Sequence, residues 1–156
     1  MNDDARFEDG GEAPLYLGAL DAEDLQVISS LCQDAVFPAS EMRWDRAAGR
    51  FALLLNRVRW EDPGSDRHLP ERVQSVLMFS QVLSVASQGV QKGDADTILS
   101  LLSVTFEQTE APSGYVTLTL AGDGAIRLHI EAIEANIKDV TRPYAAPSKK
   151  RPQHPD

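Results

Sequence analysis

The sequence predicts an α+β domain in which one N-terminal helix packs on a mainly antiparallel sheet of about six strands, curved or partly closed into a barrel. The first observation is that residues 115–120 and 125–130 both alternate apolar and polar side chains, with Gly122-Asp123-Gly124 between them. Such alternation around a turn is typical of a β-hairpin with one buried face. The second is an amphipathic helical pattern near the start of the chain. At 156 residues, one domain is expected.

The helical pattern begins at Asp21, whose carboxylate can cap the helix, and continues into two acidic residues that suit its positive end. Apolar residues then recur at spacings near 3.6 and form one stripe, comprising Leu25, Ile28, Cys32, Ala35 and Val36. Phe37-Pro38 ends the predicted helix, because a residue before proline avoids helical geometry.

The expected strands are 42–44, 51–55, 73–85, 102–106 and the two arms of the hairpin at 115–130. The run 73–85 is long for one strand, and Ser80-Gln81 marks a bend or bulge in it. A short helix is expected from Asp94 to about Leu99. A weak repeat relates residues 42–82 to residues 104–133, which suggests two three-stranded meanders.

Charge and proline content divide the chain into three parts. Residues 1–14 are acidic and poor in apolar side chains, so we expect them to be disordered. Residues 15–140 form the single α+β domain, and 141–156 form a flexible, basic, proline-rich tail. The net charge of −9 disfavours general binding of nucleic acid. One cysteine, no secretory signal and no long apolar run predict a cytoplasmic protein without membrane contact.

No catalytic, cofactor-binding or metal-binding residue is predicted. Cys32 lies on the apolar stripe of the helix, where packing explains it better than nucleophilic chemistry. The three histidines, His68, His129 and His154, do not fall in a metal-ligand spacing. Gly122-x-Gly124 is a hairpin turn without the helix that a phosphate site requires. Asp94 and Asp96 are explained by helix capping.

The remaining feature is a stretch rich in arginine and tryptophan, which we take as a candidate interaction surface. It comprises Arg43, Trp44, Arg46, Arg50, Arg57, Arg59 and Trp60. These residue types are enriched at protein interfaces, and they also suit single-stranded nucleic acid. The plainer alternative is a solvated face whose arginines pair with nearby acids, namely Glu41, Asp45, Glu61 and Asp62.

Four segments carry a resemblance to a known family: 20–29, 50–61, 85–90 and 124–135. They resemble an uncharacterised family of short alphaproteobacterial proteins known only as a domain of unknown function. The resemblance covers about residues 15–140. It implies a small bacterial cytoplasmic protein and brings no activity, cofactor or site residue.

The leading functional hypothesis is therefore a non-enzymatic protein-interaction or regulatory module that uses the Arg/Trp-rich hairpin. The alternative is a small-molecule-binding protein or unrecognised enzyme with a pocket between helix and sheet. A weaker alternative is RNA binding through the arginines and Lys149-Lys150-Arg151. An unknown protein partner is expected, and an exposed sheet edge would also allow a homodimer.

Overall fold

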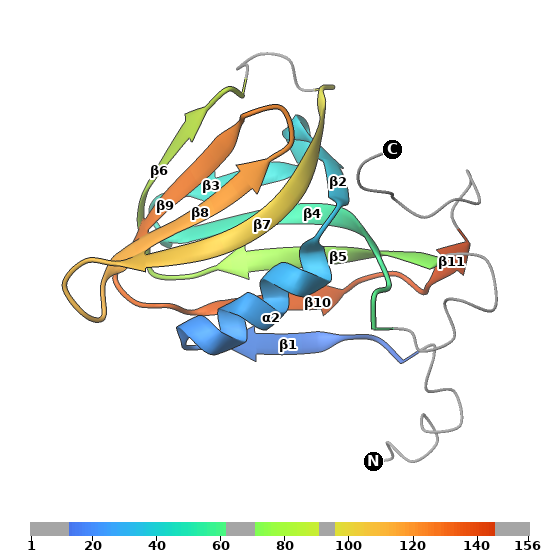
Figure 1. Ribbon diagram of the computed structural model, residues 1–156, viewed down its shortest axis with the longest axis horizontal. Helices are drawn as coiled ribbons and strands as arrows, with labels where there is room; N and C mark the ends of the chain where they lie inside the picture. The colour runs from blue at the N-terminus through green and yellow to red at the C-terminus, as the bar shows by residue number, and fades with distance from the viewer. Residues whose placement is uncertain (1–12, 62–70, 91–95, 146–156) are drawn as a thin grey trace.

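The computed structural model describes residues 13–61, 71–90 and 96–145. Within them lie one α-helix, α2 (Ala22–Cys32), a short 3-10 helix, η2 (Ala39–Glu41), and eleven strands (Figure 1). The strands are β1 (Tyr16–Ala19), β2 (Ala35–Pro38), β3 (Met42–Asp45), β4 (Arg50–Val58), β5 (Glu71–Phe79), β6 (Val82–Gln88), β7 (Ile98–Gln108), β8 (Gly114–Leu120), β9 (Ala125–Ile130), β10 (Ala135–Asp139) and β11 (Tyr144–Ala145).

The predicted α+β class with about six strands is wrong, because the protein is mostly sheet. All eleven strands belong to one sheet, and every pairing between them is antiparallel. The count was low for a physical reason. Short strands such as β2 and β11 offer too few residues for an alternation to be visible in the sequence.

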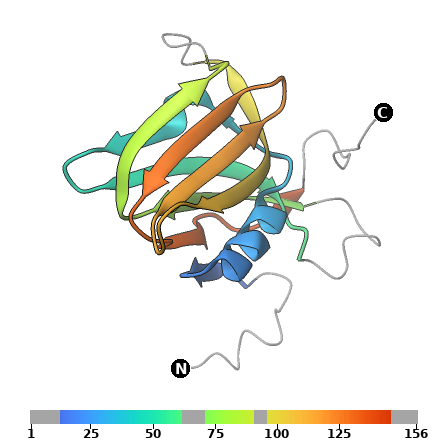
Figure 2. The ribbon, with the colours of Figure 1, turned by 60° about the vertical axis from the view of Figure 1, so that its left-hand side comes forward.

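The sheet folds over on itself into two layers (Figures 1 and 2). The strand order is β1-β10-β5-β4-β2-β7-β8-β9-β6, with β3 paired to β4 and β11 paired to β5. One layer holds β3, β4, β5, β10 and β1, and the other holds β6, β9, β8 and β7. Strand β2 joins the layers, because it pairs with β4 on one side and β7 on the other.

A second corner joins the layers where two long chain segments bend together. The run 73–85, expected to be one bent strand, is divided at Ser80-Gln81 into β5 and β6, which lie in different layers. Gln81 has a positive φ of 59°, which turns the chain there. The segment from β9 to β10 bends beside it: Ser80 N–H donates to the Glu134 carbonyl (2.8 Å), and Glu131 N–H donates to the Gln81 carbonyl (3.0 Å).

Helix α2 begins as predicted and ends earlier than predicted. The Asp21 carboxylate accepts a hydrogen bond from Asp24 N–H at 2.8 Å, which confirms the N-cap. The helix stops at Cys32, and Asp34 turns the chain with a positive φ of 67°. Ala35 and Val36, predicted to continue the helix, lie instead in strand β2 with Phe37-Pro38. Pairing with both β4 and β7 outweighs the local helical spacing there.

The hairpin at 115–130 is confirmed as β8 and β9. Its inward side chains are buried, namely Val116, Leu118, Leu120, Ile126, Leu128 and Ile130. The expected helix from Asp94 to Leu99 is wrong where it can be seen, since Ile98 and Leu99 lie in β7. Asp94 itself lies outside the described residues.

Two sets of three consecutive strands, β3-β4-β5 and β7-β8-β9, do pair as meanders. They account for six strands of the eleven. The hydrophobic core lies between the layers, and α2 contacts β1, β4, β7 and β10 over one end of it. Of the predicted tails, residues 1–12 and 146–156 lie outside the described residues, while Tyr144–Ala145 forms β11 on β5.

Candidate functional site

Strand β4 separates the Arg/Trp-rich stretch into two groups. Arg50 begins the strand and Arg57 lies seven residues later, so the two Cα atoms are about 24 Å apart at 3.4 Å per residue. The candidate residues therefore do not form one continuous surface. We call residues 43–50 the hairpin end and the surroundings of Arg57 the buried end.

At the hairpin end, three arginines are exposed to solvent: Arg43, Arg46 and Arg50. None of them forms an ion pair in the part of the chain that is described. The nearby carboxylate of Asp45 instead accepts a hydrogen bond from Ala48 N–H at 3.2 Å and closes the turn. Gly49 has a positive φ of 68°, a conformation that glycine adopts without steric cost. The side chain of Trp44 is partly buried and packs against the core.

A polar groove of about 510 Å³ lies beside this turn. Arg46 and Arg50 line it from the hairpin, residues 80–83 line it from the corner between β5 and β6, and Glu131 and Glu134 complete it. The Glu134 carboxylate accepts a hydrogen bond from the Gln81 amide at 3.1 Å. The groove thus has arginines on one wall and glutamates on another, which suits a polar chain segment better than an apolar ligand.

At the buried end, Arg57 has a side chain with 0% exposure. Its guanidinium donates two hydrogen bonds to Glu61 (Nη1 at 2.9 Å, Nη2 at 2.8 Å), one from Nη2 to Asp139 (2.9 Å) and one from Nε to Ser75 Oγ (2.9 Å). Ser75 Oγ also donates to Asp139 at 2.7 Å, and the other Asp139 oxygen accepts from Leu15 N–H at 2.8 Å. The two carboxylates raise the pKa of Arg57 against the opposing effect of burial.

This cluster ties four strands or their flanks together: Arg57 from β4, Ser75 from β5, Asp139 from β10 and the chain just before β1. Arg59 is also buried and pairs with Glu71. The alternative offered for the whole stretch was a solvated face whose arginines pair with nearby acids. The pair Arg57–Glu61 forms, but Arg57 is buried, and the hairpin end shows no ion pair among the described residues. Trp60 is 37% exposed, and its indole N–H donates to the Gln33 carbonyl at 2.9 Å.

Sequence analysis named Glu61 among the acids near the arginines but missed Asp139 and Ser75, although a signal was present. Phe51, Leu53 and Leu55 alternate inward along β4, and Arg57 continues the same series. An arginine in an inward position requires buried acceptors, so the series predicts carboxylates facing it. Nothing in the sequence points to Asp139, which lies 82 residues away.

Arg72 is intermediate in burial between Arg57 and the exposed arginines of the hairpin end. Its Nη1 donates to the Asn56 carbonyl (3.1 Å) and to Asn56 Oδ1 (3.0 Å), while the Asn56 amide donates to the Tyr144 hydroxyl at 2.6 Å. Partial burial lowers the pKa of Arg72.

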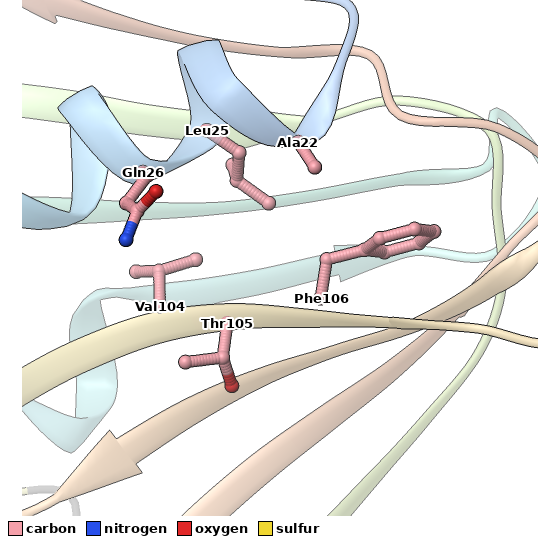
Figure 3. Close-up of a pocket in the computed structure, with 6 residues that line it drawn as sticks. All are labelled: Ala22, Leu25, Gln26, Val104, Thr105 and Phe106. Carbon is pink, nitrogen blue, oxygen red and sulfur yellow. The ribbon is translucent and has the colours of Figure 1, made fainter.

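A pocket lies between α2 and β7, where the alternative hypothesis expected one (Figure 3). Its volume is about 240 Å³, and Figure 3 shows Leu25 and Gln26 of the helix facing Val104 and Phe106 of the strand. Drug-sized ligands usually occupy about 300–1,000 Å³, so this pocket fits only a small molecule.

In residues 13–61, 71–90 and 96–145, the other titratable side chains show no catalytic geometry. Cys32 is buried as predicted, and burial raises the pKa of its thiol to about 12, opposed weakly by the charge of Arg57. His129 lies on the outer face of β9 and stacks on Tyr115 at 4.8 Å, while Arg127 lies over the same ring at 3.7 Å. Among the described residues, no group of three His, Cys, Asp or Glu side chains could hold a metal ion.

The fold and the site define a small, mostly β protein with two main charged features, a buried ion-pair cluster and a basic hairpin. The chain belongs to the family of proteins of unknown function DUF2948, which it matches over residues 15–154. No curated protein and no solved structure matches it. In the described part of the chain, no helix has the length and apolar character needed to cross a membrane.

Proposed function

We propose that this protein is a non-enzymatic interaction module that docks an acidic region of a partner protein on the hairpin end. The observation that carries the proposal is the contrast among its arginines. Arg57 and Arg59 are buried and paired with carboxylates, whereas Arg43, Arg46 and Arg50 are exposed and make no ion pair with any residue that the structure describes.

Three guanidinium groups on one hairpin repel one another, and Asp45, the single acid of residues 43–50, offsets only one of these charges. Arginine is well suited to the partner role, because its planar fork can donate two parallel hydrogen bonds to one carboxylate. On a chain of net charge −9, a local basic patch also orients an acidic partner, since the rest of the surface repels it.

The test is a quantitative pull-down from native bacterial lysate with the wild-type chain and the charge-reversed variant Arg43→Glu/Arg46→Glu/Arg50→Glu. The matched control reverses three exposed cations elsewhere, Arg127→Glu/Lys138→Glu/Arg142→Glu, and so changes the net charge equally. We expect a protein that the wild type and the control retain and the hairpin variant loses. A partner set that is identical for all three chains refutes the proposal, and captured RNA in place of protein supports the weaker alternative.

The pocket between α2 and β7 supports a second candidate, the binding of a small metabolite. A screen of metabolites by thermal shift tests it, since a ligand at a hundredfold excess over its Kd stabilises the fold by about 2.7 kcal/mol. Gln26→Leu, which removes the polar group on the pocket wall, should abolish any shift seen. A screen without any shift leaves the interaction module as the proposal.

We place the protein in the bacterial cytoplasm, and in the alphaproteobacteria in particular. The support for this is the sequence resemblance in segments such as 124–135, together with a cysteine that packs in the core as a free thiol. A regulatory role for the interaction follows from the same proposal and is tested by identifying the captured partner.

A further inference from the structure

We infer that the partner supplies an extended acidic segment, which adds as a new strand to the free edge of β6 and places its carboxylates on Arg46 and Arg50. The inference rests on the proposed function, because it names the partner chemistry of the same hairpin end. It depends on three features: the edge itself, its distance from the arginines, and the charges around the groove.

Strand β6 is the last strand of the sheet order and pairs only with β9 among the described strands. Figure 2 shows it as the outermost strand of its layer. Its seven residues, Val82–Gln88, include no charged residue and no proline. Proteins normally protect exposed edges with such residues, because an unpaired row of N–H and C=O groups attracts another strand.

The other edges are better protected. Strand β3 has four residues, of which two, Arg43 and Asp45, are charged. Strand β1 also has four residues, and α2 packs against it. The longest unprotected edge of the described sheet is therefore β6, although Leu83 forms an irregularity in its pairing with β9 near one end.

The edge begins beside the hairpin end. Val82 N–H donates to the Gly49 carbonyl at 2.9 Å, so the turn that carries Arg46 and Arg50 lies against the first residue of β6. The groove of about 510 Å³ is lined by these arginines and by Val82 and Leu83. A strand added to β6 would enter this groove at one end.

Two apolar side chains of β6 are incompletely covered. Leu83 is 48% exposed, and Val85 is only partly buried against the core. Alternate side chains of an added strand point to the two faces of the sheet, so apolar ones can cover these residues.

The charges determine which chain fits. Arg46 and Arg50 make no ion pair with a described residue, whereas the Glu134 carboxylate on the opposite wall accepts a hydrogen bond from the Gln81 amide. A basic segment would gain only Glu131 and Glu134 and would meet both arginines. An acidic segment gains ion pairs with Arg46 and Arg50, on the turn that lies against the first residue of β6.

The probe is a fluorescein-labelled peptide, Glu-Glu-Val-Thr-Val-Thr-Glu-Glu, whose carboxylates lie at both ends so that either strand direction is served. The control peptide has lysine in place of each glutamate. Two further peptides are N-methylated at alternate amides, one in the odd positions and one in the even positions. A strand that adds to an edge uses the amides of one side only, so one N-methylated peptide should lose binding and the other should keep it.

Binding is measured by fluorescence anisotropy with the full chain. We expect the acidic peptide to bind, the lysine peptide not to bind, and Arg46→Glu/Arg50→Glu to raise the Kd about tenfold or more. Ser84 is exposed on β6, so Ser84→Glu should weaken binding while the matched Ser84→Lys strengthens it. Hydrogen exchange should show new protection confined to the amides of β6.

The outcomes separate this inference from the proposed function. If both N-methylated peptides bind like the parent while Arg46→Glu/Arg50→Glu still weakens binding, the hairpin docks acidic chains and strand addition is wrong. If the arginine variant binds like the wild type, both ideas fail. No saturable binding overturns the inference alone, since the pull-down decides the proposed function. A dimer of the free protein that Ser84→Glu dissociates also overturns it, because the occupant is then a second copy.

Discussion

The two ends of strand β4 put the same side chain in opposite environments. At the buried end, Arg57 has no exposed surface and donates hydrogen bonds to two carboxylates and one hydroxyl. At the hairpin end, Arg46 and Arg50 are exposed and make no ion pair in the described structure. A buried arginine whose desolvation is offset by carboxylate partners is typical of a structural role. An exposed arginine without an ion-pair partner is available for binding.

The difference arises from position in the strand. Side chains alternate across a sheet, so the parity that buries Leu53 and Leu55 also buries Arg57. Arg46 lies in the turn, and Arg50 lies at its end, where neither layer covers them. A stretch rich in arginine therefore does not by itself identify an exposed binding surface. The comparison between the two ends of β4 can be tested at each end.

The largest effect is expected for Arg57→Met. The substitution removes the only described cation on Asp139, whose side chain is 2% exposed, so a buried carboxylate is left without its charge partner. Breaking such a pair costs about 3–5 kcal/mol. Urea unfolding followed by circular dichroism measures the loss.

The control is Arg57→Met combined with Asp139→Leu, which removes both charges. It should recover part of the loss, because two apolar groups in place of a buried pair are often neutral. A loss below about 1 kcal/mol for Arg57→Met alone would show that the cluster does not hold the strands together.

The next effect is on Cys32, which serves as a reporter of the buried end. Its thiol is fully buried, so a thiol reagent such as DTNB reacts only when the structure opens. Arg57→Met should speed the native-state reaction by a factor of ten or more, at about 1.4 kcal/mol per tenfold, if opening passes through the buried end. The hairpin variant should react at the wild-type rate, and equal acceleration by both variants would contradict the comparison.

The same thiol predicts a pH dependence. Burial raises the pKa of Cys32 from its ordinary 9.0 to about 12. Between these values the unfolded chain releases the proton and the folded chain keeps it, so the free energy of unfolding falls as the pH rises. The contribution of Cys32 is measured above pH 9 as the difference between the wild type and Cys32→Ala in the slope of the free energy of unfolding against pH. Parallel curves for the two proteins would show that the thiol ionises equally in the folded and unfolded states.

These predictions depend on features that the sequence revealed unevenly. The hairpin at 115–130 was predictable because both arms alternate over six residues around a glycine turn. The start of α2 was predictable because Asp21 caps it locally. Both are short-range effects that the neighbouring residues determine.

Features that depend on contacts between distant parts of the chain were not predicted. Ala35 and Val36 continue the helical spacing, and they become part of β2 because β4 and β7 lie on either side. The bend at Ser80-Gln81 was visible as an irregularity, yet its consequence, the passage from one layer to the other, needed residues 131–134 beside it. In the candidate site, the sequence identified the types of residue. It did not separate Arg57 from the hairpin arginines, because the alternation of inward side chains along β4 was not extended to position 57.

An intermediate effect is expected for Arg72→Gln. Arg72 makes two hydrogen bonds to Asn56 and has no carboxylate within ion-pair distance in the described structure. A hydrogen bond to a charged group contributes about 1.5–3 kcal/mol, and partial exposure places the loss near the lower value. Urea unfolding should therefore rank Arg72→Gln between the two ends of β4. A loss equal to that of Arg57→Met would show that burial alone, without carboxylate partners, sets the cost.

The smallest effect on stability is expected for Arg43→Glu/Arg46→Glu/Arg50→Glu. The three side chains are exposed and form no ion pair with the described residues, and surface substitutions of this kind change the free energy of unfolding by about 0.5 kcal/mol or less. Thermal unfolding at low and high salt measures the change. Reversal places glutamates near Asp45, Glu131 and Glu134, so like-charge repulsion should make any loss larger at low salt than at high salt. If the variant instead loses as much stability as Arg57→Met, the hairpin arginines support the fold, and their exposure is no longer an argument for a partner.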